Sequence, residues 1–283
     1  MLATRVNNAD QAKTFAANRA TGHIALSVSV HDGVTRRTRV HEDGSLRVRF
    51  PNATPEALEA VLVNTGGGMT GGDRCSIEMD VGAGASLIAG TAAAEKIYRS
   101  SGADAAMDVR LTLAPSARLA WLPQEMILFD RARLKRRIDI DLAEGAALIM
   151  AEAVIFGRAA MDEAMKEGFF TDAWRIRRDG KLIYADTARL DGAIAAKMAE
   201  RAVANGGIAI ATVLIAPGGD AALEQVRALG ETLEAGFLGE VGISAWNGLA
   251  VVRLCAKDGA TLRRDLIAVL AALGTQVPRL WLQ

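Results

Sequence analysis

The sequence predicts a mainly β protein, folded as a solenoid-like (β-helical) stack of strands, with a few α-helices mostly in its C-terminal third. The first observation is a series of short alternating apolar runs punctuated by glycine, which occurs 28 times against 6 prolines. The second is a degenerate strand-turn-strand repeat with a period near 30 residues. The third is composition: 51% of residues are hydrophobic but only 5% are aromatic, which suits narrow layers of small aliphatic side chains.

Three alternating segments open the predicted β-rich part. His23–His31 ends at an Asp-Gly pair, which favours a two-residue hairpin turn because both positions tolerate a positive φ. Thr38–His41 and Leu46–Phe50 continue the alternation, so we expect a three-stranded antiparallel meander. Pro55–Leu62 is interpreted as a short turn or helix, and Ala60–Asn64 as the next strand.

The middle of the chain carries the repeat. Three segments share a strand end, a small-residue turn and a new apolar strand: Asp80–Leu87, Leu113–Leu119 and Asp141–Leu148. Their turn positions, Gly84, Ser116 and Gly145, are 32 and 29 residues apart. Because each unit is strand-turn-strand, the period predicts stacked β layers.

The character of the sequence changes after about residue 186. Helices and strands are expected to alternate there: helix Thr187–Ala204, strand Ile208–Ile215, helix Asp220–Ala235, strand Leu249–Cys255 and helix Ala260–Leu273. No long Pro/Ser linker separates the two parts. We therefore expect one domain over residues 1–283, β-rich to about residue 185 and α+β from about 186 onward.

The overall charge and apolar content exclude several classes of partner. The 33 Lys and Arg residues balance 33 Asp and Glu, which argues against broad electrostatic capture of nucleic acid or an anionic membrane. The longest apolar run, Ile208–Ala216, is about half of the roughly 20 residues that a membrane helix needs. Met1–Ala20 has no apolar core, so no secretory signal is predicted and we expect a cytoplasmic protein.

One glycine motif invites a nucleotide-binding interpretation. Gly66–Gly71 matches G-x-G-x-x-G after a predicted strand, but Asp73–Met79 alternates like a strand where dinucleotide binding needs a helix. We therefore interpret the glycines as a tight connection between strands, with Asp73 bonding local backbone amides. Nucleotide binding is the minor alternative.

Cysteine and histidine are sparse. Two cysteines exclude a disulfide scaffold and a four-cysteine zinc site. Cys75 and Cys255 are interpreted as inert core thiols, with a transient metal role as the alternative. His23, His31 and His41 are 8 and 10 residues apart, and we interpret them as surface residues of strands.

Three carboxylates accompany apolar strands. Glu125 and Asp130 flank one strand, and Glu152 lies within the apolar run Leu148–Phe156, where burial without a partner costs several kcal/mol. Two interpretations stay open: satisfied strand-edge or turn caps, or an internal wet passage that carries a divalent metal. Lys96–Ser100 is interpreted as a solvated edge, with a partner surface as the alternative.

Five separated motifs resemble one family in order and spacing, over nearly the whole chain. They contain Gly67, Gly68, Gly71, Gly72 and Asp73; Lys96, Tyr98 and Arg99; Pro123 and Gln124 before Glu125, with Ile127 and Phe129 following; Gly157 and Arg158; and Trp281 within Pro278–Trp281. Together they resemble the urease accessory protein UreD (UreH) family. The Pro-Gln-Glu motif followed by Phe is the most specific part.

The resemblance implies a mostly β fold, in agreement with the repeat, and a role that is not enzymatic. It implies a scaffold that binds the apo-urease subunits UreA, UreB and UreC, and docks UreF and, through UreF, the GTPase UreG. Together they deliver Ni²⁺ to a carbamylated lysine of urease. The nucleotide then belongs to UreG, no cofactor is tightly bound to this chain, and Ni²⁺ passes in transit through an internal tunnel.

The resemblance also suggests roles for particular residues. Candidates for the polar lining of the tunnel are Glu125, Asp130 and Glu152, and those for a partner surface are Lys96, Tyr98 and Arg99. Glu125→Ala is expected to lower nickel delivery and to leave UreF binding intact.

The sequence departs from the family at two places. Ala92 and Glu95 stand within a segment that is usually Thr-Gln-Ala-Ala-Thr-Lys, and Asp162-Glu163 replaces a Gly-Glu pair. Two alternatives remain: a carbohydrate-active β-solenoid enzyme with paired carboxylates, which the low aromatic content disfavours, and a degenerate paralogue that only binds partners.

Overall fold

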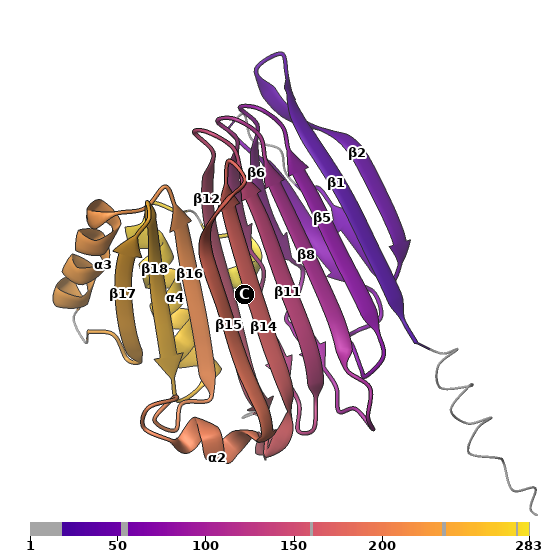
Figure 1. The fold of residues 1–283 in the computed structure, drawn as a ribbon, viewed down its shortest axis with the longest axis vertical. Helices are drawn as coiled ribbons and strands as arrows, with labels where there is room; N and C mark the ends of the chain where they lie inside the picture. Colours follow the sequence, from indigo (N-terminus) through magenta and orange to yellow (C-terminus); the bar gives the residue numbers. More distant parts are fainter. Residues whose placement is uncertain (1–18, 52–55, 159–160, 234–235, 276, 283) are drawn as a thin grey trace, which may run out of the picture.

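The computed structural model describes residues 19–51, 56–158, 161–233, 236–275 and 277–282, and it confirms the predicted architecture (Figure 1). Strands make up 56% of it and helices 15%, and the strands form a β-solenoid of about four turns. The helices lie in the C-terminal part, as predicted. Residues 1–18, where no secretory signal was predicted, Pro55 of the predicted turn and Ala235 of a predicted helix lie outside the described residues.

One sheet has seven strands in the order β15-β14-β11-β8-β5-β1-β2. Their bounds are β1 Thr21–His31, β2 Val34–Gly44, β5 Arg74–Val81, β8 Ala105–Leu113, β11 Arg133–Leu142, β14 Glu167–Arg178 and β15 Lys181–Ala193. Strands β1, β5, β8, β11 and β14 pair in parallel, whereas β2 and β15 pair antiparallel at the two edges.

The second sheet has eleven strands, with a main order β17-β18-β16-β12-β9-β6-β4-β3. The bounds are β3 Leu46–Arg49, β4 Leu58–Asn64, β6 Ser86–Thr91, β9 Arg118–Leu122, β12 Ala147–Arg158, β16 Ala209–Ala216, β17 Glu240–Trp246 and β18 Leu249–Ala256. The short strands are β7 Glu95–Ile97, β10 Met126–Leu128 and β13 Glu163–Ala164. Strands β7, β10 and the second half of β12 pair in parallel.

The repeat predicted from the sequence is the winding of the solenoid. Each unit sends one strand to each sheet, so β5, β8 and β11 stack on one side and β6, β9 and β12 on the other. The turn positions Gly84, Ser116 and Gly145 all have positive φ, at 68°, 58° and 68°. The amide of Gly84 donates to Pro115 O at 3.1 Å, and that of Ser116 to Glu144 O at 3.1 Å, so successive turns bond to one another.

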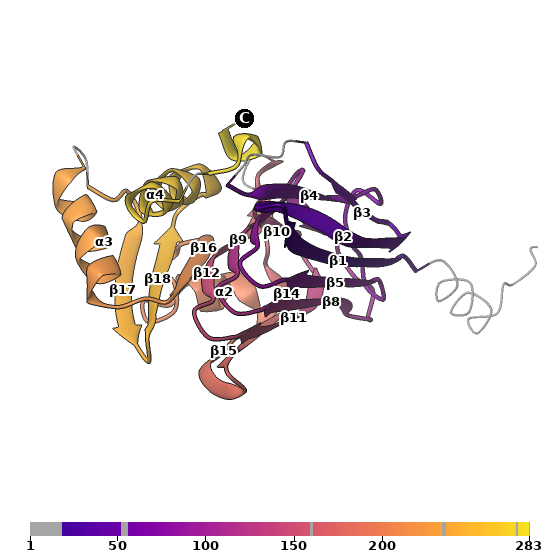
Figure 2. The same ribbon diagram turned by 90° about the horizontal axis from the view of Figure 1, so that it is seen from above.

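Two hydrophobic cores follow from this winding. The larger lies between the two sheets and includes Ile24, Leu111 and Leu134. The smaller lies where the eleven-stranded sheet extends beyond the solenoid and the helices cover it (Figure 2). The helices over this smaller core are α3 Asp220–Thr232 and α4 Gly259–Ala272, with a final 3₁₀ turn, Arg279–Leu282. Helix α2 Ile194–Ala199 instead packs on the larger core through Ile194 and Met198.

Three predictions of secondary structure need correction. The third strand of the expected meander, β3, pairs with β4 in the other sheet, so only β1 and β2 form the hairpin. The helix expected over Thr187–Ala204 is wrong in its first part, because residues to Ala193 pair with β14 as strand β15, and only Ile194–Ala199 is helical. The turn or helix expected over Pro55–Leu62 is wrong from Leu58 onward, because strand β4 begins there. Strand β17 was not predicted. Strands β16 and β18 and helices α3 and α4 lie as expected.

Candidate functional site

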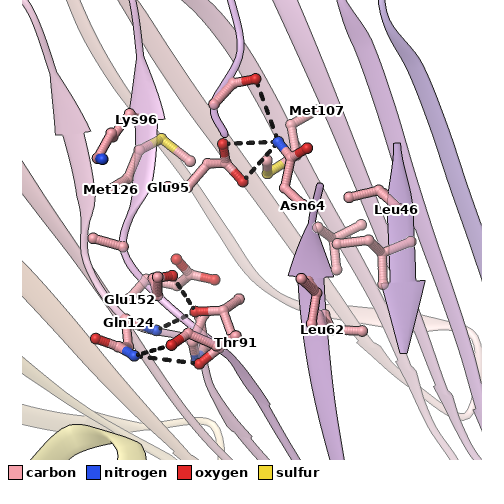
Figure 3. A pocket seen from close by; sticks show the side chains of 18 of the residues that line it. Leu46, Leu62, Asn64, Thr91, Glu95, Lys96, Met107, Gln124, Met126 and Glu152 are labelled. Atoms are coloured by element: carbon pink, nitrogen blue, oxygen red, sulfur yellow. Dashed lines mark hydrogen bonds between the residues drawn. The ribbon is translucent and has the colours of Figure 1, made fainter. Parts of the chain in front are cut away.

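Two cavities between the sheets share lining residues, and the larger of these two has a volume of about 170 Å³ (Figure 3). Its apolar wall includes Ile77, Met107 and Val109 from the seven-stranded sheet, and Leu62 and Trp121 from the other. Seven polar residues also line it: Asn64, Thr91, Glu95, Lys96, Gln124, Arg136 and Glu152. The solenoid interior therefore holds a cavity in which apolar walls surround a small number of polar groups.

Arg136 joins two carboxylates within the core. Its Nε lies 2.9 Å from Asp172 Oδ1 and its Nη2 lies 2.6 Å from Asp172 Oδ2, a bidentate pair. Its Nη1 donates to Glu152 Oε2, and Trp121 Nε1 donates to Glu152 Oε1 at 2.7 Å. All four residues are buried. Glu152 therefore has the partners that a buried carboxylate needs.

The electrostatics of this cluster follow from burial and proximity. Burial raises the pKa of Glu152, and the charge of Arg136 and the bond from Trp121 oppose that rise. Burial alone would lower the pKa of Arg136, but the charges of Asp172 and Glu152 raise it above its ordinary value. One guanidinium faces two carboxyl groups, so with both ionised the cluster carries one net negative charge.

A second cavity of about 50 Å³ shares Arg136 and Glu152 with the first. Its remaining lining includes Asp172, Tyr184 and Asp186. The buried ion pair is thus at the junction of two cavities within the solenoid.

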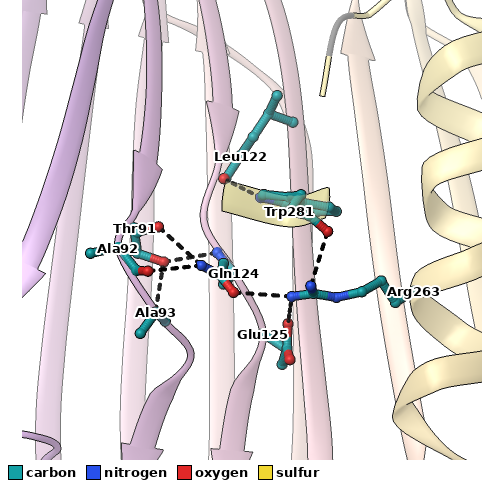
Figure 4. Close-up of polar contacts among 8 residues, drawn as sticks. All are labelled: Thr91, Ala92, Ala93, Leu122, Gln124, Glu125, Arg263 and Trp281. Carbon is teal, nitrogen blue, oxygen red and sulfur yellow. Dashed lines mark hydrogen bonds and ion pairs between the residues drawn. The ribbon is translucent and has the colours of Figure 1, made fainter. Parts of the chain in front are cut away.

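Gln124 and Glu125 connect the solenoid to helix α4 (Figure 4). Arg263 Nη2, on that helix, lies 3.0 Å from Gln124 Oε1 and 2.7 Å from Glu125 Oε2. Arg263 Nη1 donates to Trp281 O at 3.0 Å, and Trp281 Nε1 donates to Leu122 O at 3.0 Å. The Leu-Pro-Gln-Glu motif and the C-terminal tryptophan are therefore parts of one contact. Pro123 and Gln124 also line the larger cavity.

Asp130 holds a connection between strands. Its Oδ1 accepts hydrogen bonds from the amides of Lys166 at 2.7 Å and Glu167 at 3.1 Å. Its own amide donates to Glu163 Oε1 at 2.7 Å. The structure thus does not bring Glu125, Asp130 and Glu152 together: of the three, Glu152 lines the two cavities described above.

The glycine motif forms the tight connection predicted between strands β4 and β5. Asp73 Oδ2 accepts from the local Thr70 amide at 2.7 Å, as expected, and Asp73 Oδ1 also accepts from the distant Ala20 amide at 2.9 Å. Gly67, Gly68 and Gly72 have positive φ values. A strand follows the motif, so no helix N-terminus is available there for a pyrophosphate.

An exposed aromatic and basic cluster lies beside this connection. Tyr98 is 37% exposed, packs edge-on against Phe129 at 4.9 Å between ring centroids, and donates to Gly67 O at 3.0 Å. The guanidinium of Arg158 lies 4.1 Å from the centroid of Phe129 and pairs with Glu163.

Lys96 and Arg99, the other predicted partner-surface residues, are exposed as well. Gly157 has φ 106°, and a Cβ there would lie 2.4 Å from the carbonyl oxygen of Glu163.

The interpretation of the thiols and histidines holds for Cys75, His31 and His41, whereas Cys255 and His23 are half-buried, with His23 Nδ1 2.7 Å from Ser76 Oγ. Cys75 is buried, and burial together with the charges of Glu95 and Asp73 raises its pKa to about 12. His31 and His41 are exposed on the first hairpin. Among the residues that the structure describes, no group of three or more His, Cys, Asp or Glu is placed to hold a metal ion.

Sequence reasoning did not select Arg136, Asp172, Asn64 or Glu95 as site residues. A usable signal was present for the first two. Arg136 occupies an inward position of β11 and Asp172 an inward position of β14, so each interrupts an alternating apolar series with a charge. A charged residue in the apolar phase of a strand predicts a buried ion pair or a functional site.

Comparison with known proteins identifies the family of this chain. Residues 20–282 match the family model described as UreD urease accessory protein. The urease accessory protein UreD of Rhodopseudomonas palustris strain HaA2 is 56% identical over 283 residues, covering 100% of both chains. That of strain BisA53 is 54% identical over 98% of this chain and 97% of the relative, and that of Bradyrhizobium diazoefficiens is 53% identical over 95% and 96%.

The fold and the site define a β-solenoid protein with buried polar groups at the junction of interior cavities. The family match spans almost every residue that the structure describes. This chain belongs to the UreD urease accessory protein family. No helix within the described ranges has the length and apolar character to cross a membrane.

Proposed function

We propose that this protein acts in the maturation of urease as a non-enzymatic scaffold in the cytoplasm. It binds the apo-urease subunits UreA, UreB and UreC, docks UreF and, through UreF, the GTPase UreG. It carries Ni²⁺ as cargo and holds no cofactor tightly. The observation that carries the proposal is the match to urease accessory proteins at 53–56% identity over almost the full chain.

The interior cavities are our candidate for the route of Ni²⁺. A route with few, weak oxygen ligands suits transit, because a tight histidine and cysteine cage would not release the ion. Glu152 lines both cavities and is the best supported passage residue. Because its pair with Arg136 lies at their junction, movement of an ion from one to the other requires that pair to rearrange.

Glu125 and Asp130 stay predicted passage residues. Glu125 is paired with Arg263, and Asp130 accepts two backbone amides, so each already has a structural partner. Glu125→Gln and Asp130→Asn keep the side-chain size and remove the charge. We expect either to lower the nickel content of urease if its charge guides the ion, with UreF still bound.

Lys96, Tyr98 and Arg99 form the proposed partner surface. Reversing the exposed charges in Lys96→Glu and Arg99→Glu should weaken co-purification with UreF, whereas Arg110→Glu on the outer face of β8 should not. If the Lys96→Glu and Arg99→Glu variants retain as much UreF as Arg110→Glu does, these residues are not part of the interface.

Complementation tests the proposed role as a whole. The gene is deleted from a urease-positive host, and urease activity and the nickel content of purified urease are measured with and without the restored gene. We expect both to fall on deletion and to recover on restoration. Normal activity and nickel content in the deletion strain would contradict the scaffold role.

A further inference from the structure

The two sheets end beside one another at the N-terminal end of the solenoid, with β2 as the edge of one and β3 as the edge of the other. Side chains occupy backbone groups of β3. Glu42 Oε1 accepts the Val48 amide at 2.6 Å, Arg49 Nη1 donates to Val48 O at 2.7 Å, and Arg47 Nη1 donates to Leu46 O at 2.6 Å. These bonds close the edge of β3 to a further strand.

The edge of β2 is open by comparison (Figure 1). Within the described residues, no side chain is bonded to the backbone of β2 between Thr35 and His41, and the residues from Arg36 to His41 are exposed. Every second residue of an edge strand directs its N–H and C=O away from the neighbouring strand. Strand β2 therefore presents unpaired backbone donors and acceptors to solvent.

A β-bulge places two arginines of this edge on the same face. Arg36 pairs with Ser29 and Arg39 with Ser27, so Thr38 is the extra residue on β2. Residues that pair across two strands share a face, and here it is the face opposite the core. A regular strand therefore meets Arg36 and Arg39 with two residues at alternate positions, as β1 does.

The positive charge of these arginines is not matched by the chain itself. Among the residues that the structure describes, neither Arg36 nor Arg39 forms an ion pair, and Glu42 pairs with the arginines of β3. Asp80 lies on the same row as Arg39, but Ser27 stands between them and bonds to Asp80. Like charges on paired strands are destabilising, so this edge disfavours β2 of a second copy and favours an acidic strand.

The inner side of the same edge carries apolar surface. Val40 pairs with the buried Leu26 and so belongs to the face toward the core, yet it is 41% exposed. The guanidinium of Arg37 lies 4.9 Å from the ring centroid of the half-buried Phe50. An added strand with apolar side chains on this face would cover Val40.

We infer that the edge of β2 from Thr35 to His41 is a docking site for an extended acidic segment of a partner protein, which adds to the seven-stranded sheet as a further strand. Two carboxylates at alternate positions of the segment pair with Arg36 and Arg39, and its apolar side chains cover Val40. Main-chain hydrogen bonds supply affinity and the charges supply selectivity. This site is separate from the proposed partner surface and does not depend on the proposed function.

A fluorescent peptide of alternating glutamate and valine, long enough to span the edge, tests the site by anisotropy with the purified full-length chain. We expect saturable binding, and none by a lysine and valine peptide. Arg36→Glu and Arg39→Glu should each weaken binding about threefold or more, because a like-charge pair replaces an opposite-charge pair. Arg201→Glu, at an exposed arginine in the turn after α2, is the matched control and should stay within about twofold of wild type.

Methylation of alternate backbone nitrogens of the peptide separates strand addition from charge attraction. Only the amides that face β2 donate to it, so methylation in one phase should abolish binding and methylation in the other should preserve it. Circular dichroism checks that each variant is folded.

Three results would overturn the inference: no saturable binding of the unmodified peptide to wild type, equal binding by folded Arg39→Glu and Arg201→Glu, or equal binding of the two methylated peptides. Sedimentation of the chain alone tests the other occupant. A wild-type dimer that Arg39→Glu dissociates would assign the edge to a second copy and would also overturn the inference.

Discussion

Arg136 and Glu152 form a buried ion pair across the solenoid, and both residues line the two interior cavities described above. Arg136 comes from β11 and Glu152 from β12, so the pair spans the two sheets within one turn of the winding. Asp172 lies on β14, 36 residues after Arg136, and supplies the second carboxylate. The winding of the solenoid therefore brings charges from β11, β12 and β14 to one point.

Replacement of Arg136 by methionine should destabilise the protein strongly. The variant leaves Glu152 and Asp172 buried without their cation, and loss of one partner of a buried pair costs about 3–5 kcal/mol. Arg137→Met, the exposed neighbour that pairs with Asp139, should cost at most about 1 kcal/mol. Urea unfolding measures both, and equal free energies of unfolding for the two variants would refute a structural role for the cluster.

The pKa of Glu95 predicts how stability varies with pH. Its value in the folded protein, about 7, lies above the ordinary 4.5, so the native state binds the proton more tightly than the unfolded state. The stabilisation from this proton is complete below about pH 4.5 and is lost as the pH rises through 7. Glutamine does not titrate, so the free energy of unfolding of Glu95→Gln should not show this loss.

Thermal unfolding at pH 5 and pH 8 checks this prediction. Relative to wild type, Glu95→Gln should gain stability between pH 5 and pH 8, and Glu78→Gln, on the exposed face of β5, should not. Parallel curves for wild type and Glu95→Gln over this range would show that Glu95 is ionised in the native protein throughout.

The sequence predicts most of the solenoid because the residues that indicate its turns and strands act locally. Turn residues at Gly84, Ser116 and Gly145 repeat near 30 residues, and each turn needs a left-handed backbone at that position. The pairing partner of a strand is a non-local property. Leu46–Arg49 alternates as an antiparallel hairpin strand would, but its inward side chains Leu46 and Val48 are buried in the other sheet.

The helix predicted from Thr187 onward was wrong for a similar reason, since strand pairing is a non-local property. Its alanines favour a helix, but pairing with β14 overrides that preference from Thr187 to Ala193. The candidate site was predicted less completely than the fold. Glu152 was predicted because a carboxylate stands within an apolar run. Arg136 stands between Lys135 and Arg137, so its place in the inward series of β11 is harder to recognise, although the alternation carries it.

Gly71→Ala should destabilise the glycine connection through a steric clash. A Cβ at Gly71 would lie 2.3 Å from the carbonyl oxygen of Ala103 and 1.9 Å from Ser100 Oγ. Overpacking of this kind costs about 1–3 kcal/mol. Gly102→Ala is the matched control, because a Cβ there meets no atom within 4 Å. Unfolding free energies that are the same for both variants would contradict the contact.

Arg263→Met should loosen the C-terminal end of the chain without unfolding the solenoid. Arg263 contacts Gln124, Glu125 and the carbonyl oxygen of Trp281, so its loss removes the hydrogen bonds that join α4 to the loop after β9. Half-buried charged hydrogen bonds of this kind are worth about 1–3 kcal/mol together.

Hydrogen exchange resolved by peptide separates a local from a global effect of this change. We expect faster exchange over Gly259–Ala272 and Arg279–Leu282 in Arg263→Met, with β5, β8 and β11 unchanged. Arg227→Met, which removes an exposed pair with Glu224 on α3, is the control and should leave the C-terminal residues protected. Uniformly faster exchange over both sheets would mean that the contact stabilises the solenoid itself, since the two parts would then unfold together.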